Sequence, residues 1–272
     1  MVFFLVVAVL TPAALLSLAH QLIRRRAPPV RKVPPGNTLS LEKNGLVNPE
    51  DRVALQLAFL TGADFRWLAT GKTAKLDEND AALVAWHEKV TSYMIETQLT
   101  WSEKHGYILT ARDHDTEDFQ GAICIIPPIY YGTDNPKWRQ TLQHLSSVVP
   151  LGKPATMQDA DCHKRFEAFT GSTSKQHSQV LKGTAHWYVA LVGVVGSAQG
   201  KGVGRRLLEQ GLDFMGKDYP IYLECHTENI PFYQKMGFEH NASYDLLPKV
   251  EGSEDYHYNG MLRPAAAATK ES

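Results

Sequence analysis

The chain has 272 residues, of which 43% are apolar, and this is enough to bury the core of one ordinary domain with extensions. Its 28 Lys and Arg nearly balance its 29 Asp and Glu, so neither a strong overall charge nor a basic patch favours nucleic acid as a partner. The three cysteines, Cys124, Cys162 and Cys225, are too scattered for a disulfide framework or a metal site, and we expect a reducing compartment and no metal.

The N-terminus is strongly apolar. Residues 2–23 contain no Lys, Arg, Asp or Glu, and Arg24, Arg25 and Arg26 follow them. Because about 20 apolar residues suffice for one helix to cross a bilayer, residues 1–23 are predicted to be a transmembrane anchor. The basic residues after it place the rest of the chain on the cytosolic side. Two alternatives stay open: a signal peptide for secretion, cleaved after Ser17-Leu18-Ala19, or a misassigned start, which would leave the protein in the cytoplasm.

The middle of the chain is divided by composition. Residues 24–45 are basic and proline-rich and are interpreted as a linker, residues 46–263 as the folded domain, and residues 264–272 as a short tail. Within the domain, Asn48-Pro49-Glu50-Asp51 is typical of a helix start, and helical spacing predicts a second helix from Asp80 to about Lys104. An additional strand is expected within residues 38–43.

Two strands and an irregular segment come next. Residues 106–112 and 119–126 read as strands, and the acidic turn between them predicts a hairpin. Residues 130–182 are predicted to be helical in pieces. Aromatic residues of this segment are candidates for an apolar acceptor pocket, although such a density of rings is also common in cores: Tyr130, Tyr131, Trp138, Phe166 and Phe169.

A strand, a glycine-rich loop and a helix follow in residues 187–195, 196–204 and 205–214. Glycines allow the backbone to approach an anion, and the N–H groups at the helix start can hold it, so the arrangement is typical of phosphate binding. The Walker A loop is excluded because Gly202, rather than Ser or Thr, follows Gly200-Lys201. The dinucleotide fingerprint is excluded because Gly204 stands two residues after Gly202 instead of three.

The pattern Gln199-x-x-Gly202-x-Gly204 resembles the acetyl-CoA signature of the GNAT N-acetyltransferases. Farther on, Tyr233-Gln-Lys-Met-Gly237-Phe238 resembles the element that closes their fold, and the combination is similar to the branch that includes puromycin N-acetyltransferase. There are departures: Val194-Val195-Gly196 replaces the usual Val-Asp-Pro, and Asn229 stands four residues before Tyr233, where relatives have an Asn seven before it.

The resemblance implies an α/β (α+β) fold with a mixed, twisted sheet between helices, splayed between the fourth and fifth strands, and acetyl-CoA as cosubstrate. The diphosphate of CoA is expected on the loop and helix start, and the pantetheine beside the end of the preceding strand. The implied cofactor-binding residues are Val194, Val195, Gln199, Gly200, Lys201, Gly202, Val203, Gly204, Arg205 and Asn229.

The resemblance also implies a direct attack of the acceptor amine on the thioester. Tyr233 is the expected acid for the departing thiolate, and Glu224 is the first choice for the base or amine-positioning group, with His186 second. The expected acceptor is a primary amine of a small molecule, with a protein or peptide amine second. A non-catalytic, membrane-tethered CoA-binding module is the alternative, and the oligomeric state stays open.

Overall fold

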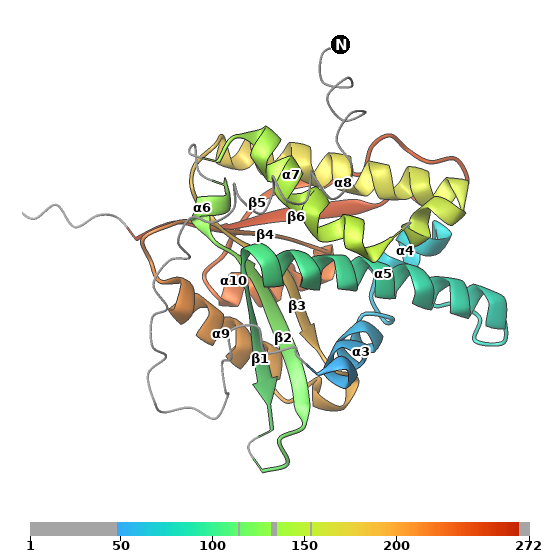
Figure 1. The fold of residues 1–272 in the computed structure, drawn as a ribbon, viewed down its shortest axis with the longest axis horizontal. Helices are drawn as coiled ribbons and strands as arrows, with labels where there is room; N and C mark the ends of the chain where they lie inside the picture. The colour runs from blue at the N-terminus through green and yellow to red at the C-terminus, as the bar shows by residue number, and fades with distance from the viewer. Residues whose placement is uncertain (1–47, 114, 132–134, 153, 267–272) are drawn as a thin grey trace, which may run out of the picture.

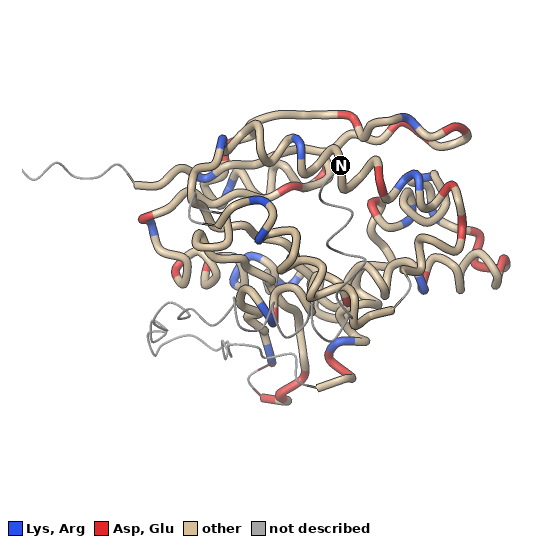
Figure 2. Tube along the Cα trace, turned by 45° about the horizontal axis from the view of Figure 1, so that its top comes forward, with Lys and Arg blue, Asp and Glu red and all other residues tan. Residues whose placement is uncertain are grey.

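The computed structural model describes residues 48–113, 115–131, 135–152 and 154–266. The predicted anchor (1–23), linker (24–45) and additional strand (within 38–43) lie outside the described residues, as does most of the predicted tail. Among the described residues, no helix combines the length and apolarity that crossing a bilayer requires. Figure 2 shows Lys and Arg interspersed with Asp and Glu along the described trace rather than gathered in one region.

Helices α3 (Pro49–Ala58), α4 (Ala63–Thr70) and α5 (Ala81–His105) open the described chain. The predicted starts of α3 and α5 are confirmed, because each has a side chain that caps it. Asn48 accepts a hydrogen bond from the Glu50 N–H at 2.9 Å, and Asp80 accepts one from the Leu83 N–H at 3.0 Å. Helix α4 ends at Gly71, whose φ of +76° is the left-handed conformation that glycine adopts at helix ends.

A mixed sheet of six strands forms the centre, in the order β1-β2-β3-β4-β6-β5. The strands are β1 (Tyr107–Arg112), β2 (Phe119–Ile126), β3 (Trp187–Val194), β4 (Ile221–Cys225), β5 (Glu239–Asp245) and β6 (His257–Arg263). Strands β1 and β2 form the predicted antiparallel hairpin, and β3 and β4 pair in parallel. The predicted mixed sheet is therefore confirmed (Figure 1).

Strands β3 and β4 separate toward their carboxyl ends. Their register contains Trp187 opposite Ile221 and Tyr188 opposite Tyr222, and no further pair, although β3 continues to Val194 and β4 to Cys225. The strands are neighbours at the start and splayed at the end. This is the opening that the resemblance implied between the fourth and fifth strands, when the strand expected before Asn48 is counted.

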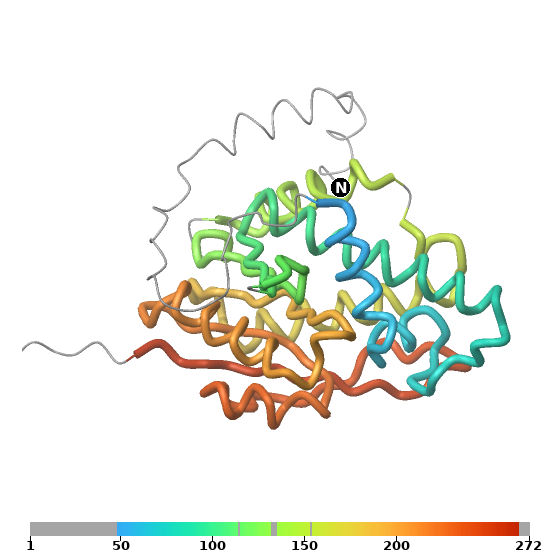
Figure 3. The backbone as a smooth tube through the Cα atoms, turned by 90° about the horizontal axis from the view of Figure 1, so that it is seen from below, coloured from blue at the N-terminus to red at the C-terminus, as the bar shows by residue number. Residues whose placement is uncertain are grey.

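Helices cover both faces of the sheet (Figure 3). Helices α9 (Val203–Met215) and α10 (Ile230–Lys235) pack on one face around Leu207, Leu223 and Cys225, whereas α3 and α5 pack on β1–β3 around Leu55, Ile95 and Ile108. The segment between β2 and β3 is helical in pieces, as predicted. Its elements are α6 (Pro128–Tyr131), α7 (Lys137–Val148), η1 (Val149–Leu151), η2 (Ala155–Gln158) and α8 (Ala160–Leu181).

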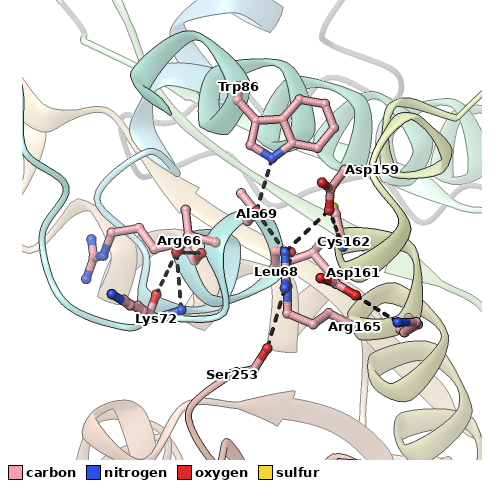
Figure 4. Close-up of polar contacts among 12 residues, drawn as sticks. Arg66, Leu68, Ala69, Lys72, Trp86, Asp159, Asp161, Cys162, Arg165 and Ser253 are labelled. Atoms are coloured by element: carbon pink, nitrogen blue, oxygen red, sulfur yellow. Dashed lines mark hydrogen bonds and ion pairs between the residues drawn. The ribbon is translucent and has the colours of Figure 1, made fainter. Parts of the chain in front are cut away.

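Helix α4 is fastened at its carboxyl end by a buried arginine of α8 (Figure 4). The Arg165 guanidinium donates hydrogen bonds to the carbonyl oxygens of Leu68 at 2.8 Å and Ala69 at 2.9 Å. The Trp86 indole of α5 donates to the same Ala69 oxygen at 3.0 Å. Because hydrogen bonds from charged donors to otherwise unpaired helix carbonyls are among the stronger ones, α4 has a fixed position on α5 and α8.

Candidate active site at the splayed strands

The glycine loop begins where β3 ends. After a single 3₁₀ turn, η3 (Gly196–Ala198), the backbone takes left-handed conformations at Gly200 (φ +73°) and Gly202 (φ +76°), and α9 starts at Val203. A Cβ added at Gly200 or Gly202 would meet no atom within 4 Å. Conformation rather than crowding therefore favours glycine at both positions.

The start of α9 is open to an anion. No side chain caps it, and its first turn contains no acidic residue. The Arg206 N–H bonds back to the Gly202 carbonyl at 3.1 Å, so the N–H groups before it, those of Val203, Gly204 and Arg205, have no intrahelical partner. Together with the helix dipole these groups attract a phosphate.

Not every predicted residue of the loop presents its side chain to a ligand. The Val203 side chain is buried in the core, so this residue can contribute only its N–H. The Arg205 side chain pairs with Glu209 at 2.8 Å, and Lys201 is exposed. The Gln199 amide donates to the Val194 carbonyl at 3.0 Å, so this side chain braces the loop against the strand.

The end of β3 corrects one predicted contact. The Val195 N–H donates to the Gln120 carbonyl at 2.9 Å, and the Val195 carbonyl accepts from the Ala198 N–H at 2.9 Å. Both backbone groups of Val195 are therefore used within the protein and cannot pair with a pantetheine. Because successive residues of a strand direct their backbone groups to opposite sides, Val194 directs its N–H toward the gap beside β4, whereas its carbonyl already accepts from the Gln199 amide.

Glu224 lies near the end of β4, on the other side of the gap, and its side chain is partly buried. The Tyr188 hydroxyl donates a hydrogen bond to Glu224 Oε2 at 2.8 Å. Burial raises the pKa of Glu224 to about 7, and the Tyr188 and Tyr222 hydroxyls limit the rise. A carboxyl group with this pKa can take up and release a proton near neutral pH.

Tyr233 reaches the end of β4 from the opposite face of the sheet. It lies on α10, is partly exposed, and packs against the cluster that contains Cys225. Burial first, and then the neighbouring Cys225 and Asp64, raise the pKa of Tyr233 above its ordinary value of 10.0. The phenol is therefore protonated at neutral pH, as a proton donor must be. Asn229, at the start of α10, is exposed, and its N–H donates to the His226 carbonyl at 2.9 Å.

His186 has a structural environment, which corrects its choice as second candidate base. Its side chain is buried, with Nδ1 2.6 Å from the Thr184 carbonyl and Nε2 2.6 Å from His177 Nε2. Because a carbonyl only accepts, Nδ1 donates and Nε2 accepts from His177. Both nitrogens are therefore occupied, and burial lowers the pKa of His186 to about 4.

The five aromatic residues proposed for one acceptor pocket separate in the structure. Tyr130 and Tyr131 lie beside Trp101 and Tyr188, whereas Phe166 and Phe169 pack into two other clusters, and Trp138 is 46% exposed. The prediction of a shared pocket is wrong, because α8 is long enough to carry Phe166 and Phe169 away from α6. Tyr131 contacts Tyr188, whose hydroxyl donates to Glu224.

A second carboxyl group at the site was missed by sequence reasoning. Asp64, in the first turn of α4, is partly exposed and accepts a hydrogen bond from the Tyr256 hydroxyl. It lies close enough to Tyr233 and Cys225 to contribute to the raised pKa of each. No local pattern indicates Asp64, since its partner Tyr256 is far away in the sequence.

Space is present beside the loop. A hollow of ≈ 290 Å³ lies between α3 and the chain that follows β3, where Val195, Gly196 and Gln199 form one wall. Figure 1 shows α3 near the end of β3. Among the described residues, no group of three His, Cys, Asp or Glu could hold a metal ion. The arrangement thus combines an anion site, a gap between two strands, a proton acceptor and a proton donor.

Residues 165–238 match the sequence profile of the acetyltransferase (GNAT) family. An uncharacterized N-acetyltransferase of Schizosaccharomyces pombe is 36% identical over 93 residues, which cover 32% of this chain and 38% of the relative. The N-alpha-acetyltransferase RimI of Mycobacterium tuberculosis is 35% identical over 71 residues, which cover 25% of this chain and 44% of the relative. The matched parts thus span less than half the length of these curated relatives.

Solved structures with a similar chain course include a Corynebacterium glutamicum protein described as histone acetyltransferase HPA2 and related acetyltransferase. It is 21% identical, with 86% of this chain and 99% of that chain covered and a TM-score of 0.46. A Pyrococcus horikoshii protein is 14% identical, with 84% and 99% covered and a TM-score of 0.44.

Proposed function

Residues 165–238 belong to the acetyltransferase (GNAT) family, and on this premise we propose that the protein transfers the acetyl group of acetyl-CoA to a primary amine. The observation that carries the proposal is the splay of β3 and β4. It brings an uncapped helix start and an unpaired strand edge from one side together with Glu224 and Tyr233 from the other.

The residues at the end of β3 fit acetyl-CoA as cosubstrate. The N–H groups at the start of α9 and the left-handed turns at Gly200 and Gly202 suit the diphosphate, because no acidic residue of that turn opposes it. The edge of β3 at Val194 suits the amide groups of pantetheine. Among the residues predicted for this role, Gln199 acts by bracing the loop, and Val195 is left out because its backbone groups are occupied.

Glu224 and Tyr233 have complementary roles in the proposed reaction. Glu224 takes a proton from the acceptor ammonium, and the freed lone pair forms the new C–N bond at the thioester carbonyl. The C–S bond then breaks, Tyr233 gives its proton to the departing thiolate, and the nitrogen releases its second proton to water as the amide forms. The products are an N-acetylated amine and free CoA, and exchange with water restores both side chains. The pKa of Glu224, raised to about 7, supports its role as base, and the raised pKa of Tyr233 means that it still carries its proton at neutral pH.

A small amine remains the first choice of acceptor, and a peptide amine is the second. The second candidate gains support from the similarity to a relative named as an N-alpha-acetyltransferase. A non-catalytic CoA-binding module is disfavoured by the presence of both Glu224 and Tyr233 at the end of β4.

The replacement Tyr233→Phe tests the proposed acid. With the full-length chain and acetyl-CoA, we expect amine-dependent release of free thiol, and we expect kcat to fall by about 10²-fold or more in Tyr233→Phe. Tyr219→Phe is the matched control, because Tyr219 is 45% exposed in the turn before β4. A panel of small amines and peptides identifies the acceptor class. If acetyl-CoA binds and no amine on the panel releases thiol, the catalytic proposal is wrong.

A further inference from the structure

Two carboxyl groups flank the end of β4. Glu224 is next to the last residue of the strand, Cys225, and Asp64 approaches from α4. Burial raises the pKa of Cys225 to about 12, and both Asp64 and Glu224 add to the rise, so both lie near its thiol. The gap between β3 and β4 therefore opens toward a place with two acidic side chains.

Neither carboxyl group forms an ion pair with a Lys, Arg or His among the described residues; their hydrogen-bond donors are the neutral hydroxyls of Tyr256 and Tyr188. His226 and Arg66 lie near enough to Asp64 to lower its pKa, but burial is the larger effect and raises it. Asp51, which is more deeply buried, differs because Arg112 pairs with it. A half-buried carboxylate without a cation is costly, and a bound ammonium group would offset that cost at each position.

Aromatic rings surround both carboxyl groups. Tyr188 and Tyr222 stack at an interplanar angle of 24° beside Glu224, and His226 stacks on Tyr256 at 24° beside Asp64. Tyr258 lies near both groups, since both add to its raised pKa. The Tyr222 hydroxyl is fully buried and has no protein hydrogen-bond partner of good geometry. Rings of this kind suit an alkyl chain and its ammonium groups.

The helix that carries Asp64 is fixed by two contacts. Arg165 holds the last carbonyl groups of α4 (Figure 4). The Trp67 indole, in the middle of the helix, donates to the Glu254 carbonyl at 2.7 Å in the chain that leads to β6. Trp67 also stacks on Tyr256, the donor to Asp64, at 25°. Asp64 is thus held at the site by contacts that leave its other oxygen for a ligand.

We propose that the acceptor is an aliphatic diamine, whose reacting amino group lies at Glu224 while its second ammonium group binds Asp64. The inference rests on the proposed acetyltransferase function and goes beyond it by naming the class of acceptor. Asp64 is a specificity-determining residue in this arrangement.

The test compares 1,4-diaminobutane with butylamine as acceptors of the full-length protein. We expect kcat/KM to be at least about tenfold higher for the diamine, mostly through KM, because one charge-assisted contact is gained. In Asp64→Asn this preference collapses, and Asp64→Glu, which keeps the charge, restores part of it. Glu88→Gln, on an exposed position of α5, is the matched control and keeps the preference.

A binding measurement separates the two proposals. Calorimetric titration of 1,4-diaminobutane in the presence of CoA needs no turnover, and we expect Asp64→Asn to weaken binding by about tenfold. Binding of this kind without acetylation would contradict the proposed function and support the acceptor site. Acetylation of both amines with equal kcat/KM, or no binding of the diamine, would overturn the inference. If Asp64→Asn does not fold, the ratio of kcat/KM for 1,4-diaminobutane to that for butylamine, measured with the wild-type protein, tests the inference by itself.

Discussion

Glu224 differs from most acidic side chains of the chain because its burial is not compensated by a cation. The hydroxyl groups of Tyr188 and Tyr222 only limit the rise of its pKa to about 7. A base must be deprotonated to act, so we expect kcat/KM to rise with pH up to about 7 and to level off above it. Glu224→Gln should lower kcat/KM by about 10²-fold and remove this limb of the profile. If kcat/KM of Glu224→Gln still rose with pH up to about 7, the base would be another residue.

The pair of His177, which is partly exposed, and the buried His186 predicts loss of stability in mild acid. Burial lowers the pKa of His177 to about 3 and of His186 to about 4, below the ordinary value of 6.5. The unfolded chain therefore binds protons at these residues first, and the stabilisation present above pH 6.5 is lost as the pH falls toward 4. We expect the free energy of unfolding to fall by roughly 4 kcal/mol, about 2 kcal/mol from each histidine, from about pH 7.5 to pH 5. Urea titrations measure it, and His177→Gln with His186→Gln should flatten the dependence.

The residues of the site differ in how far the sequence could predict them. Gln199, Gly202 and Gly204 carry a local pattern, and Glu224 follows from its place at the end of a short strand. Asp64 could not be found in this way, because its role depends on α4 meeting Tyr256. The choice of His186 was wrong for a related reason: its partner His177 is on α8, and no local pattern indicates that contact.

At the scale of elements, local signals predicted helix starts and strand–loop–helix order well. Asn48 and Asp80 cap their helices because a side-chain oxygen and an N–H two or three residues later decide the contact. The order of the strands in the sheet, in contrast, depends on contacts between residues that are far apart in the sequence. Strand β6 lies between β4 and β5, and this pairing joins Cys225 to Asn259 and Tyr244 to Tyr258, which sequence spacing alone does not indicate.

The turn into α9 can be tested with a pair of glycines. Gly202→Ala forces a side chain into the left-handed region, so we expect the protein to lose about 1 kcal/mol of stability and the KM for acetyl-CoA to rise. Gly171→Ala is the matched control, because this glycine lies within α8, where a Cβ would meet no atom within 4 Å. That replacement should stabilise the protein by about 0.5–1 kcal/mol. If Gly202→Ala and Gly171→Ala changed the KM for acetyl-CoA equally, the proposed role of the loop in binding acetyl-CoA would be wrong.

At the scale of the whole molecule, the proposed membrane attachment rests on the sequence of residues 1–23. We propose that they anchor the protein with its acetyltransferase domain in the cytosol. The full-length chain is then expected to remain in the membrane pellet after alkaline carbonate extraction, and a chain lacking residues 2–23 to move to the supernatant. A mature N-terminus after Ala19 would support the signal peptide instead. Release of the full-length chain by carbonate would contradict the anchor.

The short register between β3 and β4 has a consequence for solvent exchange. Beyond Tyr188 and Tyr222 the facing edges of the strands lack a backbone partner in each other. The Val194 amide should therefore exchange its hydrogen for deuterium far faster than that of Val195, which donates to Gln120. A cosubstrate that lies between the strands would form hydrogen bonds with the edge of β3 that faces the gap. Protection of the Val194 amide, with no change at Val195, would then report occupancy directly.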